Sequence, residues 1–270
     1  MGCRLVDSGF GDAFTNMAID EGLAQLCKEP ILRFYQWSPK AVSLGYNQKI
    51  SDININYCKK NDIDIVRRIT GGKAVLHDKE LTYSFIVPEK LNLVPRDINE
   101  SFKKIAGVLI FGLSQVGINA ELQKKPERIS TPVCFNSSNW YELTVEGKKI
   151  SGSAQRRIKG ILLQHGSILL DFDTKENVKI FTTQDSKATE TQFNDKITSI
   201  KSQLQKPVSI NSLKKGIEEG VSRQFGFEIF NSKLTTQETI LASTIKEYKI
   251  CESKIMVKEN DKERTNAEFL

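Results

Sequence analysis

Three short stretches of the sequence combine residue types that can do chemistry. Residues 67–78 read RRITGGKAVLHD, residues 131–147 place a cysteine within TPVCFNSSNWYELTVEG, and residues 147–157 read GKKISGSAQRR. A glycine pair lets the backbone approach a ligand closely and expose its N–H groups. A thiol can act as a nucleophile when a cation lies beside it, and a lysine can be that cation.

The glycine stretch has two interpretations. Gly71 and Gly72 lie between strand-like segments, and Arg68 and Lys73 add positive charge beside them, which suits an anionic or elongated ligand. A hairpin turn that needs a positive φ would use the same glycine pair. The stretch matches neither a Walker loop nor G-x-G-x-x-G, so the pattern alone leaves both interpretations open.

Cys134 differs from the other cysteines in its polar surroundings. The chain has five cysteines, far apart and without a C-x-x-C pair, and only two histidines. Neither a zinc site nor a disulfide framework is therefore expected. A free thiol titrates near ~8.5, so a nucleophile at neutral pH usually needs a neighbouring cation. Lys149 is a candidate for that cation, but the residues alone leave Cys134 either incidental or nucleophilic.

The lysine stretch is equally ambiguous. Lys149 is followed by the small residues Ser151, Gly152, Ser153 and Ala154, which would leave a narrow channel along the backbone with an ammonium at one end. A solvent-exposed lysine pair in a hairpin turn would give the same letters. His165 lies between two apolar runs, where it either joins the site or is a buried structural histidine.

The elements that must position these stretches predict an α+β fold with mixed or antiparallel β-sheets flanked by helices. Alternating and apolar runs predict strands at residues 1–9, 31–37, 41–48, 63–69, 81–88, 141–145, 161–163 and 168–170. Apolar residues at helical spacing predict helices at 12–27, 97–116, 209–226 and 235–249. Residues 186–203 read as a polar loop with little core, and Cys27 falls on the buried stripe of the first helix.

Composition excludes several classes of protein. The net charge of +6 is mild and its basic residues are spread out, without a basic and aromatic motif, so we expect no nucleic-acid partner. No apolar stretch approaches the ~20 residues that a membrane span needs, and the polar N-terminus is not a signal peptide. We therefore expect a cytoplasmic protein with no membrane association, and a monomer.

Taken together and in this order, the motifs resemble the biotin/lipoate protein ligase superfamily, and most closely its LipM-type octanoyltransferases. The resemblance rests on RRITGGKAVLHDKELTYS, VCFNSSNWYE, GKKISGSAQRR and ILLQHGSILLD, and extends over about residues 4–175. It implies a catalytic domain, which we place over residues 1–230. The residue pattern predicts a C-terminal helix and a flexible charged tail over 231–270. Lys73, where the family usually has arginine, and the inserted Asn139 depart from the pattern.

Carried over position by position, the resemblance assigns roles to the candidate residues. Cys134 would form an acyl thioester, and Lys149 would lower the pKa of its thiol and orient the acyl carbonyl. The acyl pocket would be lined by two groups of residues. These are Arg68, Thr70, Gly71, Gly72, Lys73, Ala74, Val75 and His77 from the glycine stretch, and Ser151, Gly152, Ser153, Ala154 and His165 from the second half.

The implied reaction moves an octanoyl group from octanoyl-acyl carrier protein to a lysine of a lipoyl domain, with no cofactor and no metal. The acceptor would be the glycine cleavage H protein or a dehydrogenase E2 subunit. Three alternatives remain: an ATP-dependent lipoate–protein ligase, an amidotransferase between two lipoyl domains, and a non-catalytic protein that binds lipoyl domains. The presence of Cys134 and of Lys73 in the glycine stretch argues against the ligase.

Overall fold

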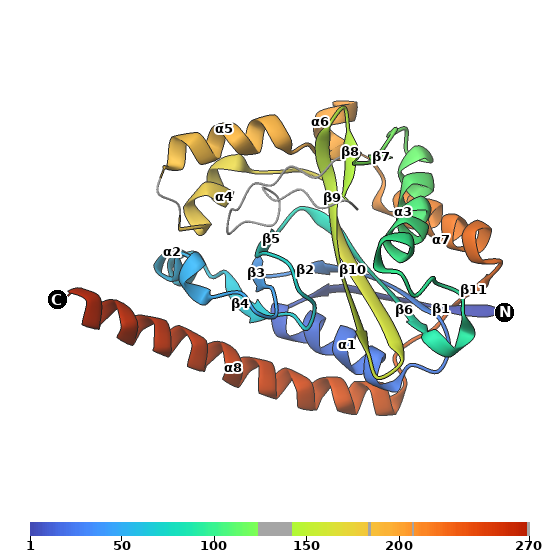
Figure 1. Cartoon of the computed structure of the whole chain (residues 1–270), viewed down its shortest axis with the longest axis horizontal. Coiled ribbons are helices and arrows are strands. Elements are labelled where there is room, and N and C mark those ends of the chain that lie inside the picture. The colour runs from blue at the N-terminus through green and yellow to red at the C-terminus, as the bar shows by residue number, and fades with distance from the viewer. Residues whose placement is uncertain (124–141, 183–184, 207, 269–270) are drawn as a thin grey trace.

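The structure is a computed structural model that describes residues 1–123, 142–182, 185–206 and 208–268 (Figure 1). Within these residues an eight-stranded sheet forms the centre of the molecule and a three-stranded sheet lies beside it. In spatial order, the large sheet contains β11 (Glu228–Asn231), β1 (Gly2–Gly11), β2 (Ile31–Trp37), β6 (Glu80–Pro88), β10 (Ile161–Leu169), β9 (Lys148–Ile158), β8 (Leu143–Val145) and β7 (Glu121–Leu122). The small sheet contains β4 (Asp64–Arg67), β3 (Ala41–Leu44) and β5 (Val75–His77).

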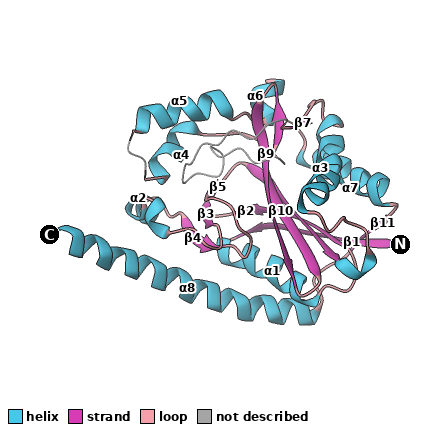
Figure 2. Ribbon diagram, viewed as in Figure 1, coloured by secondary structure: helices cyan, strands magenta, loops and turns pink. Residues whose placement is uncertain are grey.

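Strand directions confirm the predicted α+β class with mixed sheets. β1 runs parallel to both β11 and β2, whereas the pairs from β2 through β6, β10, β9 and β8 to β7 are antiparallel. Helices flank the sheets, as Figure 2 shows. They are α1 (Ala13–Leu26), α2 (Ile55–Lys60), α3 (Ile98–Ser114), α4 (Thr174–Ile180), α5 (Ser186–Lys196), α6 (Ile200–Leu204), α7 (Ile210–Phe225) and α8 (Thr236–Glu268), with 3₁₀ turns at Ile50–Asp52 and Glu89–Leu91.

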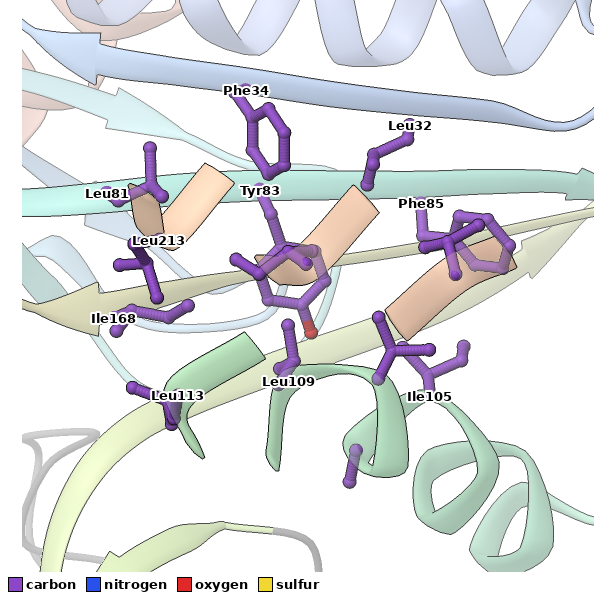
Figure 3. Packing of buried hydrophobic residues seen from close by; sticks show 14 of the residues in the cluster. Leu32, Phe34, Leu81, Tyr83, Phe85, Ile105, Leu109, Leu113, Ile168 and Leu213 are labelled. Atoms are coloured by element: carbon purple, nitrogen blue, oxygen red, sulfur yellow. The ribbon is translucent and has the colours of Figure 1, made fainter. Parts of the chain in front are cut away.

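One face of the large sheet is covered by α3 and α7. The α3 residues Ile105, Leu109 and Leu113 recur every fourth position, so they share one face of the helix and pack on Tyr83 and Phe85 of β6 (Figure 3). Asp97 caps this helix by accepting hydrogen bonds from the first-turn N–H groups. The predicted helix of residues 97–116 is confirmed to within two residues at its C-terminal end.

The opposite face of the large sheet meets α1 and the start of α8. Ile19 and Leu23 of α1 pack against Ile86 of β6 and Leu163 of β10, and Ala242 of α8 joins them. The small sheet has a core of its own with α2, α4 and α5, in which Phe193 is fully buried. None of the described helices combines the length and the apolarity that a membrane span would need.

Several sequence-based predictions differ from the structure. Residues 186–196 form α5 instead of a loop. Phe193 is the one hydrophobic residue of this helix in the core, so the sequence shows no periodic apolar pattern here. The strand predicted over 41–48 ends at Leu44, and the runs 161–163 and 168–170 belong to one strand, β10. Cys27 is half-buried rather than in the core.

The C-terminal stretch expected to be a flexible charged tail is instead the second half of α8, which is helical to Glu268. Its described inner face is held to the small sheet: Ser253 donates a hydrogen bond to the Ile65 carbonyl at 2.6 Å, and Met256 packs into the core of that sheet. The sequence did not predict this buried face, because some of its buried positions are polar or charged, among them Lys249 and Asn260.

Candidate functional site

A cavity lies between the small sheet with its glycine loop and the β2, β6, β9 and β10 strands of the large sheet. Its lining combines apolar side chains with hydroxyl and imidazole groups. The residues that line it are Met17, Tyr35, Trp37, Ser43, Arg68, Gly72, Val75, His77, Thr82, Gly152, Ser153, Ala154, His165, Gly166 and Ser167. Both histidines of the chain are therefore in this one place.

The glycine loop is held by Arg68, which is only 5% exposed. One guanidinium nitrogen donates to the Gly71 and Lys73 carbonyls at 2.8 and 2.7 Å, and the other donates to the carbonyl and the hydroxyl of Ser43 at 2.8 and 3.0 Å. Arg68 lines the cavity, and these four hydrogen bonds are all made to the protein's own chain. It fixes the shape of the loop.

Gly45, at the end of β3, lets the loop lie directly on the small sheet. A Cβ at this position would be 1.9 Å from the Gly72 carbonyl oxygen, far inside van der Waals contact with a backbone atom. Gly72 itself has φ +91°, which L side chains rarely adopt. Gly72 therefore has the positive φ expected of a turn, and the close approach in this structure is between Gly45 and the Gly72 carbonyl.

A first polar cluster, the Glu80 cluster, consists of Glu80, His77, Ser43, Thr82 and Ser167. Glu80 Oε1 accepts hydrogen bonds from His77 Nδ1 at 2.7 Å, from the Thr82 hydroxyl at 2.6 Å and from the Ser167 hydroxyl at 2.7 Å. On its other side, His77 Nε2 is 2.7 Å from Ser43 Oγ. Burial alone would raise the pKa of Glu80, but His77 and the two hydroxyls outweigh burial and lower it.

Trp37 fixes the ring of His77 from one side. The two rings stack with centroids 3.9 Å apart and planes 10° from parallel, and the indole N–H donates to the Thr82 hydroxyl at 2.7 Å. The imidazole is thus held by a carboxylate, a hydroxyl and an aromatic face, and it has little freedom to rotate.

A second polar cluster, the Asp20 cluster, consists of Asp20, Arg33, Tyr35, His165 and Thr70. Asp20 pairs with Arg33 at 2.6 Å and accepts from the Tyr35 hydroxyl at 2.8 Å and from His165 Nδ1 at 2.9 Å. His165 Nε2 lies 2.7 Å from the hydroxyl of Thr70, the residue that begins the glycine loop. Both clusters therefore follow one order, from a carboxylate through a histidine to a hydroxyl.

The charges of the Asp20 cluster determine where its protons lie. Burial opposes ionisation of Asp20, but Arg33 and His165 outweigh it and lower the pKa of Asp20 to about 2. A carboxylate can only accept hydrogen bonds, so His165 carries its hydrogen on Nδ1. Burial also lowers the pKa of His165, although Asp20 opposes that shift. The neutral ring then accepts at Nε2 from the Thr70 hydroxyl, which anchors the loop.

Lys149 lies on β9, three residues before Gly152 of the cavity, and it does not line the cavity. Its side chain is buried, and Nζ lies 2.5 Å from Glu142 Oε1. Sequence reasoning did not find Glu142, whose carboxylate offsets the cost of burying an ammonium. The Lys149 carbonyl accepts from the Thr198 N–H at 2.9 Å, which ties β9 to the segment before α6.

Cys134 and Asn139 lie outside the described residues, so their predictions stay predictions. The other four cysteines are all described. Burial raises the pKa of Cys3, Cys27 and Cys58 to about 12, which leaves their thiols protonated at neutral pH. Cys251 is exposed on α8 and does not line the cavity.

The structure brings together eight of the residues predicted for the acyl pocket. They are Arg68, Gly72, Val75, His77, Gly152, Ser153, Ala154 and His165. Thr70, Gly71 and Lys73 stand just behind the lining, joined to it by hydrogen bonds with His165 or Arg68. Ala74 packs into the core of the small sheet, and the buried Ser151 hydroxyl has no hydrogen-bond partner among the described residues.

Several residues of the site escaped sequence reasoning. Two of them left a signal: Asp20 falls on the buried stripe of the first predicted helix, and Arg33 interrupts the apolar strand ILRFYQW. A charge at a buried position is expected to have a partner, so these two could have been paired. Glu80 also follows His77 by three residues. Ser43 and Ser167 carried no comparable signal.

The chain is similar to known proteins over most of its length. The lipoyl protein ligase A/B catalytic domain family matches residues 12–222. The chain is 39% identical over 256 residues to the octanoyltransferase LipM of Clostridioides difficile, which covers 90% of this chain and 94% of that protein. It is 37% identical over 251 residues to the octanoyltransferase LipM of Bacillus subtilis, which covers 87% and 90%.

Among solved structures, a crystal structure of lipoate-protein ligase A bound with ATP is similar to this one. The TM-score is 0.77 at 24% sequence identity, covering 92% of this chain and 95% of the other. At that identity the likeness concerns the fold, which the two proteins share.

Proposed function

The chain belongs to the lipoyl protein ligase A/B catalytic domain family, and we propose that it transfers octanoyl groups through a thioester on Cys134. It is an acyltransferase of lipoate biosynthesis, an octanoyltransferase like the relatives that match most of its length. The donor that we propose is octanoyl-acyl carrier protein, and the acceptor is a lysine of a lipoyl domain, such as the glycine cleavage H protein or a dehydrogenase E2 subunit.

The observation that carries the proposal is the cavity with a buried lysine close to it on the same strand. Met17, Tyr35, Trp37 and Val75 give the cavity the apolar surface that an acyl chain needs. Lys149 precedes Gly152 by three residues, roughly 10 Å along β9 at the usual rise of a strand. That separation suits an acyl tail in the cavity and its carbonyl carbon near the ammonium.

The chemistry proceeds in two balanced steps. The Cys134 thiolate attacks the donor's thioester carbonyl, a new C–S bond forms, and the carrier leaves as a thiolate that takes up a proton. The neutral amine of the acceptor lysine then attacks the enzyme thioester, the C–S bond to Cys134 breaks, and an amide forms. The proton that the amine loses returns to the Cys134 sulfur. A thioester-to-amide transfer is downhill, so neither step consumes ATP.

In this scheme Lys149 has two tasks. Its ammonium favours the thiolate form of Cys134, and it interacts with the carbonyl oxygen as negative charge develops there. Glu142 holds the ammonium in place through their ion pair.

The test is acyl loading followed by intact mass. The wild type, incubated with octanoyl-acyl carrier protein and no ATP, should gain one octanoyl group that hydroxylamine removes. Cys134→Ser should gain none, whereas the matched control Cys251→Ser should load like the wild type. An adduct that forms only with ATP would identify a ligase instead. Loss of the adduct in Cys251→Ser would show that Cys251, and not Cys134, carries the octanoyl group.

A second measurement addresses Lys149. The alkylation rate of Cys134 against pH should shift to higher pH in Lys149→Ala, because the thiolate loses its neighbouring cation, and Lys149→Arg should keep most of the effect. An unchanged titration in Lys149→Ala would remove Lys149 from this role.

The choice of donor separates a transferase from an amidotransferase. If an octanoylated lipoyl domain loads the enzyme faster than the octanoyl-carrier protein does, the enzyme is an amidotransferase.

A further inference from the structure

A shallow groove lies where β10 ends, against α6 and the start of α7. Its floor is apolar and its rim is basic. The floor is formed by Leu170, Ile200, Val208 and Ile210. The rim carries Lys79, Lys201 and Lys206, with Asp171 and Gln205 between them. We call it the lysine-rimmed groove.

The lysines of this rim are available to a partner. Asp171 is the acidic residue of the groove, and its Oδ2 lies 2.7 Å from Lys201 Nζ and 3.7 Å from Lys79 Nζ. The two lysine side chains are 66% and 56% exposed, so their pairs with Asp171 are weak and cost little to exchange. Three lysines against one aspartate leave the groove positive.

The apolar floor is a second feature that suits a protein partner. Leu170, Val208 and Ile210 are partly exposed and pack against the main core from outside it. An incoming apolar side chain would extend this core, while the lysines would meet charges around it. Interfaces between transient partners combine an apolar centre with a charged rim in this way.

Backbone hydrogen bonds connect the groove to the site. The Lys201 N–H donates to the Leu170 carbonyl at 3.0 Å, and the nearby Thr198 N–H donates to the Lys149 carbonyl at 2.9 Å. On β10, Ser167 lines the cavity and precedes Leu170 by three residues, roughly 10 Å along the strand. A protein seated in the groove would therefore be close to both Lys149 and the cavity.

We propose that the lysine-rimmed groove is the docking surface for the donor carrier protein, which it would bind through an acidic helix that presents one apolar side chain to the floor. This inference rests on the proposed function. The charge of the rim favours the donor over the acceptor, because the acceptor must bring a lysine to the reaction and the donor brings none. Like charges disfavour a partner, and opposite charges steer it and speed its encounter.

Charge reversal tests the groove without touching the residues of the site. The triple variant Lys79→Glu, Lys201→Glu, Lys206→Glu should raise the KM for octanoyl-carrier protein at least tenfold. A small neutral thioester, octanoyl-N-acetylcysteamine, needs no docking and should load Cys134 within twofold of the wild-type rate. The matched control reverses three exposed lysines elsewhere, Lys233, Lys254 and Lys258, with the same change in net charge.

The comparison between these two variants decides the inference. The inference is supported if only the groove variant has a raised KM for the octanoyl-carrier protein. Raising the salt concentration should also reduce the difference in KM between the groove variant and the wild type. Equal losses in both variants would mean a general effect of net charge and would overturn it. So would a groove variant that loads normally but transfers slowly to the lipoyl domain, since the groove would then bind the acceptor. A wild type loaded by neither donor overturns the proposed function as well.

Discussion

Charged groups are treated in opposite ways beneath the cavity and at the lysine-rimmed groove. In the Asp20 cluster, Arg33 and Asp20 have side-chain exposures of 0% and 2% and each meets several partners. At the groove, Lys201 and Lys79 are more than half exposed and share one carboxylate. A buried charge has to be neutralised in a fixed geometry, whereas an exposed charge stays available to other molecules.

This difference has a consequence for each region. The two clusters determine the position of the glycine loop, because each ends at a hydroxyl that holds the loop or its arginine. The groove determines nothing about the loop, and its lysines can change partners at little cost. The same type of substitution, such as aspartate to asparagine, should therefore change the free energy of unfolding by very different amounts in the two regions.

The largest effect is expected for Asp20→Asn. This change leaves the Arg33 guanidinium buried without its counter-charge, which costs about 3–5 kcal/mol of unfolding free energy. Urea unfolding followed by circular dichroism measures it. Tyr35→Phe is the control, because it removes one hydrogen bond to Asp20 and keeps the ion pair, at a cost of about 1 kcal/mol. A similar small loss in both variants would contradict the importance of the buried pair.

A smaller effect is expected for Thr70→Val, because valine has nearly the same shape as threonine but lacks the hydroxyl. His165 Nε2 would lose its donor inside the protein, at a cost of about 1–3 kcal/mol. Amide hydrogen exchange at Gly71 and Gly72 should become faster, because the start of the loop is released. Thr70→Ser restores the hydroxyl and should restore slow exchange. Unchanged exchange in Thr70→Val would show that His165 does not hold the loop.

The pH dependence of stability should also distinguish the two regions. Because the pKa of His165 is lowered in the folded protein, the unfolded chain binds more protons below its ordinary value of about 6.5. Stability should therefore fall as the pH is lowered from 7 to 5, by at most about 1.4 kcal/mol per pH unit for one group. Below pH 4 stability should fall more steeply, because Asp20 takes up a proton in the unfolded chain before it does so in the folded protein, where its pKa is about 2.

The variants His165→Gln and Lys201→Gln separate the sources of this dependence. His165→Gln should flatten the slope between pH 7 and 5, whatever it does to the absolute stability. Lys201→Gln at the groove should keep the wild-type slope. Equal slopes in the wild type and in His165→Gln would show that this histidine does not titrate differently on folding.

The smallest effect is expected for Asp171→Asn in the groove. Its ion pairs involve two largely exposed lysines, so the change should cost less than about 1 kcal/mol in urea unfolding. Removing this carboxylate also makes the groove more positive, which should lower the KM for the carrier protein if the docking inference is correct. A loss of several kcal/mol would mean that the groove is organised like the buried clusters.

Most of the architecture could be predicted from the sequence. Long periodic or alternating runs gave α1, α3, α7 and the main strands, because each of these elements buries one regular face. The α5 helix and the end of α8 were missed since their inner faces are sparse or polar. The glycine loop, His77 and His165 were correctly expected to meet, on the basis of a family resemblance rather than of spacing.

The contacts of the polar residues could not be predicted from the sequence. Arg68 lines the cavity as predicted, and it also holds the backbone of its own loop. Asp20 and His165 are 145 positions apart, and Lys149 finds Glu142 through the pairing of β8 with β9. Hydrogen bonds and ion pairs form only when distant segments are placed correctly to within a few tenths of an ångström. Periodicity in the sequence sets which side of an element is buried, but it does not set those distances.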